Sequence, residues 1–119
     1  MEDIPKETQR FRVRGHLWLE SEKDRFLGPG RIELMEKIKE HGSISKAASA
    51  MGMSYKKAWN LVLSMNSQVE KPLVLTQTGG SRGGGAVVTP EGEHYIEAYK
   101  ALVVRFQEFL ANETRHLQG

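Results

Sequence analysis

The chain has 119 residues and a mass of 13.4 kDa, the size of a single domain, and it contains no cysteine. The missing cysteines exclude disulfides, thiolate catalysis and zinc–thiolate sites, and no apolar run approaches the roughly 18 residues that a membrane span needs. The formal net charge of +2 is unevenly distributed. Residues 43–88 carry five basic side chains and one acidic one, a net charge of +4, whereas residues 89–119 carry a net charge of −2. What the basic middle segment binds is therefore the main question about function.

The N-terminal part of the chain is predicted to contain a β-hairpin. Residues 1–10 are polar and expected to be flexible, and they lack the apolar segment of a signal peptide, so we expect a cytoplasmic protein. From Arg10 to Glu20 apolar and polar residues alternate, which predicts a half-buried strand. Ser21–Asp24 is predicted to form a turn, and Arg25–Leu27 a short returning strand.

Three helices are predicted next, over about 29–41, 43–51 and 54–67, from apolar residues at helical spacing. Pro29 suits a first helical position. Ser43 or Ser45 is expected to cap the second helix, and Ser54 the third. Gly42 and Gly52 suit a helix end and the turn that follows.

The last third of the chain is predicted to form a second hairpin and a long helix. Short strands at Leu73–Leu75 and Ala86–Val88 flank a tract with five glycines in the seven positions 79–85, which cannot form regular structure. Thr89 and Pro90 begin a helix that is predicted to end at about Ala111. Its apolar residues form a surface wide enough for both a core and a partner, in two stripes: Tyr95, Tyr99, Leu102, Phe106 and Phe109, then Ile96, Val103 and Leu110.

This order of elements predicts an α+β, mainly helical fold: a winged helix-turn-helix with an N-terminal β-hairpin and a long C-terminal helix. We expect one domain over 11–111, followed by a tail over 112–119.

The second and third predicted helices have the features of a DNA-binding motif. Ala47 and Ala48 let two helices approach closely, and Gly52 permits a sharp turn. Tyr55, Lys56 and Lys57 then lie in the first turn of the third helix, which suits a helix whose N-terminus enters the major groove. The alternative is an ordinary helical hairpin with a charged, solvated first turn. Trp59 is interpreted as a core residue.

The glycine-rich tract has two open interpretations. As a wing, over about 78–86, it would bring backbone amides and Arg82 to DNA phosphates or a narrow minor groove. As a plain hairpin tip it would bind nothing. A nucleotide-binding loop is excluded because no Gly-Lys-Ser/Thr ending and no immediate helix follow.

Catalysis and metal binding have little support, and we expect neither an enzyme nor a cofactor. Between His41 and Pro90 the sole acidic residue is Glu70, so a carboxylate pair for acid–base chemistry is hard to assemble. The four histidines are scattered without the spacing of a metal site.

Several stretches together resemble the N-terminal DNA-binding domain of ModE-type, molybdate-responsive transcription regulators, and more distantly the winged helix of LysR-type regulators. The stretches are Phe26–Leu34, Gly42–Trp59, Met65-Asn66 and Thr78–Gly92. The resemblance spans about Phe11 to Leu110. It implies a dimeric transcription factor whose third helix enters the major groove and whose last helix, about 89–111, holds the dimer.

The resemblance also implies a set of DNA-binding residues: Ser54, Tyr55, Lys56, Lys57 and Asn60 on the recognition helix, Ser45 and Lys46 near phosphates, and Arg82 in the wing. Tyr55, Asn60 and Lys57 are expected to read base edges of double-stranded DNA, and a two-fold dimer implies a palindromic operator. The molybdate-binding domains of such regulators have no counterpart in 119 residues. We therefore expect a stand-alone regulator without a small-molecule effector site in this chain.

Two other functions remain open. The winged fold could be a protein–protein interaction module that docks through the long helix and binds DNA weakly, which a net charge of only +2 permits. The protein could also respond to an oxyanion bound by backbone amides of the glycine-rich loop or of a helix N-terminus.

Overall fold

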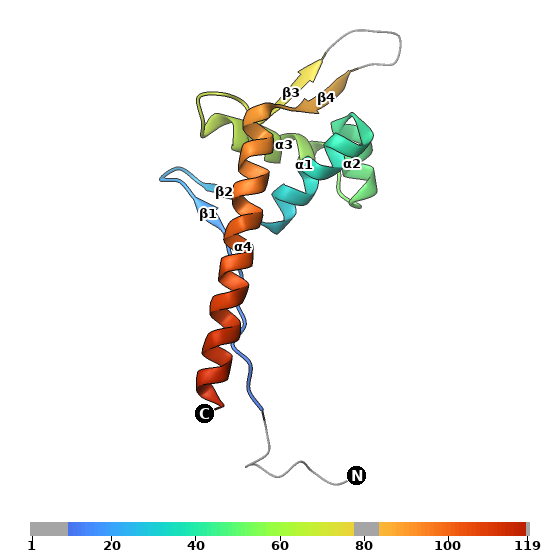
Figure 1. The fold of residues 1–119 in the computed structure, drawn as a ribbon. Helices are drawn as coiled ribbons and strands as arrows, with labels where there is room; N and C mark the ends of the chain where they lie inside the picture. Colours follow the sequence, from blue (N-terminus) through green and yellow to red (C-terminus); the bar gives the residue numbers. More distant parts are fainter. Residues whose placement is uncertain (1–9, 78–83, 119) are drawn as a thin grey trace, which may run out of the picture.

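The computed structural model describes residues 10–77 and 84–118 and confirms the winged helix-turn-helix fold (Figure 1). The elements in chain order are β1 (Leu19–Glu20), β2 (Arg25–Leu27), α1 (Pro29–His41), α2 (Ile44–Ala50), α3 (Tyr55–Ser67), β3 (Val74–Gln77), β4 (Gly85–Val88) and α4 (Pro90–Leu117). Helices α1 to α3 and the two hairpins gather around the first half of α4, whose second half extends away from them. No helix in this described part is long and apolar enough to cross a bilayer.

Local sequence signals set the starts of α2 and α3 and the turn between them as expected. Ser43, rather than Ser45, caps α2, since its hydroxyl accepts the backbone N–H of Lys46 at 3.0 Å. Ser54 caps α3 in the same way. Gly52, in the turn between these helices, has a φ of +68°, a left-handed conformation that favours glycine.

The predicted strand over Arg10–Glu20 is mostly wrong, because only its last two residues pair with β2. Residues 10–18 instead lie along α4. The backbone N–H of Val13 donates to Thr114 Oγ1 at 2.9 Å, and the hydroxyl of Tyr99 donates to the carbonyl of Leu17 at 2.8 Å. The alternation of apolar residues arises here from an extended segment packed on a helix, not from a β-ladder.

The same contact corrects the end of the last helix. The predicted end at about Ala111 is too early, because α4 continues to Leu117 and the supposed tail over 112–117 is helical. Beside Thr114, Gln118 also reaches the N-terminal segment, donating from Nε2 to the carbonyl of Phe11 at 3.0 Å. The added turns thus lie beside the N-terminal segment and are hydrogen-bonded to it. The predicted flexible segment 1–10 lies outside the described residues except for Arg10.

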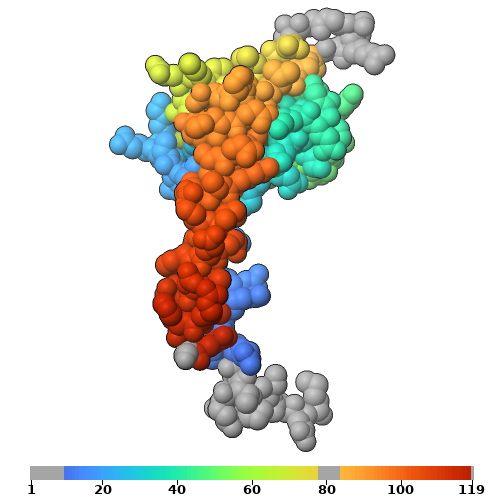
Figure 2. Space-filling model, in the orientation of Figure 1, coloured from blue at the N-terminus to red at the C-terminus, as the bar shows by residue number. Residues whose placement is uncertain are grey.

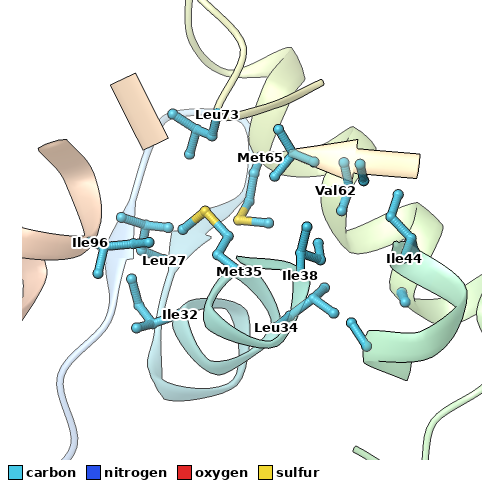
Figure 3. Close-up of a cluster of buried hydrophobic side chains, with 14 of the residues drawn as sticks. Leu27, Ile32, Leu34, Met35, Ile38, Ile44, Val62, Met65, Leu73 and Ile96 are labelled. Atoms are coloured by element: carbon cyan, nitrogen blue, oxygen red, sulfur yellow. The ribbon is translucent and has the colours of Figure 1, made fainter. Parts of the chain in front are cut away.

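One apolar core joins the helices and both hairpins (Figure 3). Met35 and Ile38 of α1 are fully buried at its centre, with Met65 of α3 on one side and Ile96 of α4 on another. Burying such side chains contributes roughly 1.5–3 kcal/mol each. The core therefore includes the inner face of α3, and the opposite face of α3 is outward.

The base of the wing is tied to the helices. The strands β3 and β4 pair antiparallel from Val74↔Val88 to Gln77↔Gly85, and the backbone N–H of Ala86 donates to the carbonyl of Gly42 at 2.9 Å. The tip of the wing, with Arg82, lies outside the described residues.

Candidate nucleic-acid interface

The outward face of α3 is polar over most of its length. Ala58, Val62 and Met65 are buried against the core. The opposite face carries four exposed residues spaced by four, three and four positions: Lys56, Asn60, Leu63 and Ser67. Sequence reasoning had singled out Lys56 and Asn60 but not Leu63, whose side chain is 48% exposed. The helical period would have predicted that Leu63 is exposed, because its position is opposite the buried stripe of Ala58, Val62 and Met65.

The first turn of α3 presents the predicted residues to solvent. Tyr55, Lys56 and Lys57 are all exposed, and Ser54 precedes them as the cap, accepting the backbone N–H of Lys57 at 3.0 Å. The rings of Tyr55 and Trp59 stack with centroids 6.2 Å apart and planes at 18°. Trp59, interpreted as a core residue, is only half-buried, and it supports the exposed ring of Tyr55.

Four predicted residues come together beside α3. Ser54, Lys56, Lys57 and Asn60 line one open hollow of about 460 Å³. Ser45 and Lys46 are exposed in the first turn of α2, on a separate element, and they do not line this hollow. Arg82, outside the described residues, cannot be placed relative to it.

Ion pairing separates the basic residues into two groups. Lysines of α1 and α4 are matched: Lys39 lies 2.9 Å from a carboxylate oxygen of Glu93, whose hydrogen bond raises the pKa of Lys39, and Lys100 lies 3.4 Å from Glu36. Within residues 10–77 and 84–118, no carboxylate forms a salt bridge with the lysines of α2 and α3, which are Lys46, Lys56 and Lys57. Their uncompensated charges make this surface attractive to phosphates.

A polar network fixes α3 to the first hairpin. Ser64 of α3 donates to Asp24 Oδ2 and accepts from Arg31 Nη1, each at 3.0 Å, and Arg31 Nη2 lies 3.8 Å from the same carboxylate. The backbone N–H of Arg25 and the hydroxyl of Ser64 lower the pKa of Asp24. Burial lowers the pKa of Arg31, whose guanidinium nevertheless stays charged. This network orients α3 from one side.

The wing is attached to the other side of α3 through Asn66. Its Oδ1 accepts the backbone N–H of Leu73 at 2.8 Å, and its Nδ2 donates to the carbonyl of Val74 at 2.9 Å. Sequence reasoning had noted Asn66 only as part of a family resemblance. Asn66 lies near the end of α3, a few residues before β3 begins. A polar side chain at such a position can hydrogen-bond the backbone of the next strand.

The described residues contain no group of three histidine, aspartate or glutamate side chains placed to hold a metal ion. This surface instead contains the N-terminus of α3. Lysines that form no salt bridge in the described part of the chain flank it, together with amide, hydroxyl and aromatic side chains. Such an arrangement can contact both phosphates and base edges.

Comparisons with known proteins identify relatives of the same kind. The sequence model of the bacterial regulatory helix-turn-helix protein, lysR family, matches residues 30–93. The chain is 42% identical over 91 residues to the molybdenum-pterin-binding protein MopB of Rhodobacter capsulatus, covering 76% of this chain and 34% of the relative. It is 43% identical over 86 residues to the DNA-binding transcriptional dual regulator ModE of Escherichia coli K12, covering 72% of this chain and 33% of the relative.

A third relative is the molybdenum transport protein ModE of Azotobacter vinelandii, which is 39% identical over 84 residues, covering 71% of this chain and 31% of the relative. The chain thus spans about a third of the length of the curated relatives that it matches. These relatives confirm the resemblance to ModE-type regulators that the sequence motifs suggested.

Proposed function

The chain belongs to the bacterial regulatory helix-turn-helix proteins of the lysR family, and we propose that it is a dimeric DNA-binding transcriptional regulator that acts in the cytoplasm. In this proposal α3 is the recognition helix in the major groove, and the wing lies on the DNA backbone or in the minor groove. The observation that carries it is the cluster of exposed, unpaired lysines at the start of α3, beside the polar face of that helix.

Each predicted residue then has a role that suits its position. Lys46, Lys56 and Lys57 bind phosphates, with Ser45 and Ser54 beside them at the helix starts. Tyr55 and Asn60 read base edges. Lys57 lies between them in α3 and could also contact a base edge. Arg82 would add a phosphate or minor-groove contact from the wing.

Dimerisation is proposed through the more exposed apolar stripe of α4, which contains Tyr95, Leu102 and Phe109. Ile96, Val103 and Leu110 follow one another at intervals of seven residues, and Ile96 and Leu110 are buried within the chain itself. The neighbouring stripe of Tyr95, Leu102 and Phe109 has the same spacing but stays partly or fully exposed, and Phe109 is 56% exposed. Phe109 lies in the second half of α4, which extends away from the rest of the domain (Figure 2). A two-fold dimer would bind a palindromic operator with half-sites about one or two DNA turns apart.

The direct test is a binding titration with duplex DNA selected from a random pool, repeated at several salt concentrations. A dimer making about six to ten phosphate contacts would lose about 10³ to 10⁵ in affinity between about 50 and 200 mM salt. Replacing Lys56 and Lys57 together with alanine should weaken binding to all sequences and reduce the salt slope by about one for each phosphate that is no longer bound. Replacing Lys39 and Lys100 together with alanine is the matched control, because it removes the same number of charges from lysines that are ion-paired on α1 and α4. Weak binding without salt dependence would overturn the proposal.

A second candidate function is a protein–protein interaction module with weak DNA binding, which the exposed apolar stripe of α4 favours. Sedimentation with and without DNA, at several salt concentrations, distinguishes the interaction module from the regulator. A salt-insensitive monomer at micromolar concentration supports the interaction module, and a salt-sensitive, DNA-bound dimer supports the regulator.

A further inference from the structure

The recognition helix α3 is held between two hairpins rather than beside one. Ser64 and Gln68 face β1–β2: Ser64 bonds Asp24, and Gln68 Nε2 donates to the carbonyl of Arg25 at 2.9 Å. Asn66 faces the wing through Leu73 and Val74. Residues two apart on an α-helix point about 200° apart, so the hairpins lie on opposite flanks of α3. Figure 1 shows them as separate projections from the domain.

On the first of these flanks, Arg25 is seated on an aromatic ring. Its guanidinium carbon lies 4.6 Å from the centroid of Trp18, a cation–π arrangement that restrains a long flexible side chain. The indole is itself held in place, because a Cβ atom on buried Gly28 would lie only 2.6 Å from Trp18 Cδ1. Arg25 therefore presents its charge in one position, at lower entropic cost than a free surface arginine.

That charge forms no salt bridge among the described residues, although Asp24 is near enough for its pKa to be lowered by Arg25, and it lies close to α3. Glu20 is the ladder partner of Arg25, but the guanidinium lies on Trp18, and no salt bridge to Arg25 occurs among the described residues. The carboxylate of neighbouring Asp24 is already engaged by Ser64 and Arg31. Arg25, Trp18 and Lys57 line a common hollow of about 240 Å³. Arg25 and Lys57, neither of which forms a salt bridge among the described residues, thus line one space beside the first turn of α3.

We propose that Arg25, seated on Trp18, binds a DNA phosphate on the flank of α3 opposite to the wing, so that the β1–β2 hairpin is a second backbone-binding element. The proposal rests on the proposed function, since it requires α3 to lie in the major groove. Phosphate contacts on both flanks would fix the tilt of the recognition helix, whereas contacts on one flank leave it free to rock. The motif-based prediction stopped at α2, α3 and the wing, and this residue lies outside all three.

The experiment compares Arg25→Ala, Arg25→Lys and Arg105→Ala in salt-dependent titrations on the DNA that the wild-type protein selects. Arg105 is the matched control, an exposed arginine on α4 whose replacement changes the net charge equally. We expect Arg25→Ala to weaken binding on the order of tenfold at about 0.1 M salt, and to lower the slope of log K against log salt by about one per subunit. The base preference should not change. Arg25→Lys should keep the slope, because the charge remains, with a smaller loss of affinity.

The possible outcomes distinguish this proposal from the proposed function. If the wild-type protein binds DNA with a steep salt slope and Arg25→Ala matches Arg105→Ala, the role of the hairpin is overturned and the regulator proposal stands. If the wild-type protein shows no salt-dependent binding, both proposals fail together. A purely structural role for Arg25, as support for Trp18, would lower the melting temperature of Arg25→Ala and leave the salt slope unchanged, which also overturns the inference.

Discussion

The side-chain amide nitrogen of Asn66, near the end of α3, donates a hydrogen bond of 2.9 Å to the carbonyl oxygen of Val74, the first residue of β3. The same side chain accepts from the backbone of Leu73. One residue of α3 is therefore hydrogen-bonded to the point where the wing leaves the domain. The geometry of the proposed DNA surface would depend on this internal contact as well as on the residues that would touch DNA.

Replacing Asn66 with alanine should destabilise the fold by about 1–3 kcal/mol, because it leaves partly buried backbone groups of β3 without partners. Urea denaturation followed by circular dichroism measures the change. Asn60→Ala is the control on the same helix, and as an exposed residue it should change the unfolding free energy by no more than about 0.5 kcal/mol. Equal stability of the two variants would show that the bridge contributes nothing.

Asn60→Ala should instead change sequence recognition. Removing a bidentate amide interaction takes away about 1–3 kcal/mol of discrimination at one base pair, while phosphate contacts persist. Competition titrations against operators with single base changes should show relaxed preference at one position in each half-site, with the salt slope of the wild type. Unaltered preference at every position would mean that Asn60 does not read bases.

Gly92 and Gly30 should respond to alanine in opposite directions. A Cβ atom on Gly92 would lie 2.6 Å from Val88 Cγ1 and would also collide with the carbonyl oxygen of Leu73, whereas nothing lies within 4 Å of one on Gly30. Gly92→Ala should therefore cost about 1–3 kcal/mol of stability through overpacking. Gly30→Ala should gain about 0.5–1 kcal/mol from helix propensity. Thermal unfolding of both variants tests the pair, and a stabilising Gly92→Ala would contradict the close approach of α4 to the wing.

Phe109→Asp should convert the proposed dimer to a monomer, because it places a charge in the exposed stripe of α4. Val104→Asp is the control: Val104 is 57% exposed, nearly equal to Phe109 at 56%, but it lies on another face of the helix. Sedimentation velocity at micromolar concentrations should show a monomer only for the first variant. If both variants or neither dissociate, the dimer uses a different surface.

The carboxylate of Asp24 should make stability depend on pH at the acid end. Hydrogen bonds from the backbone of Arg25 and from Ser64 lower its pKa in the folded state. A lowered folded-state pKa contributes stability that is present above the unfolded-state value of about 3.9 and is lost as the pH falls through the folded value. Asp24→Asn should therefore be less stable than the wild type at pH 7, and the difference should shrink below about pH 4. A pH-independent difference in melting temperature would contradict this assignment.

The local sequence was sufficient to predict most of the elements. Pro29, Ser54 and Thr89 lie at helix starts where their backbone and hydroxyl chemistry suits them, and Gly42 and Gly52 take the positive φ values that end α1 and turn into α3. The lysine-rich first turn of α3 could be predicted as well, because cap and apolar periodicity together decide which residues face outward. These signals act within one or two helical turns.

Contacts between distant residues could not be predicted in this way. The period-two pattern of residues 10–18 is the same whether the segment pairs with a strand or packs on a helix, and only the contact of Val13 with Thr114, 101 positions later, decides between them. That contact also lies in the last turns of α4, which the local pattern did not predict. No local pattern places Arg25 on Trp18 or joins Asp24 to Ser64. The sequence by itself determined where α3 begins and that its first turn faces outward, through short-range backbone chemistry. The tertiary structure alone decided what flanks that helix, because those positions result from packing that forms only when the whole chain folds.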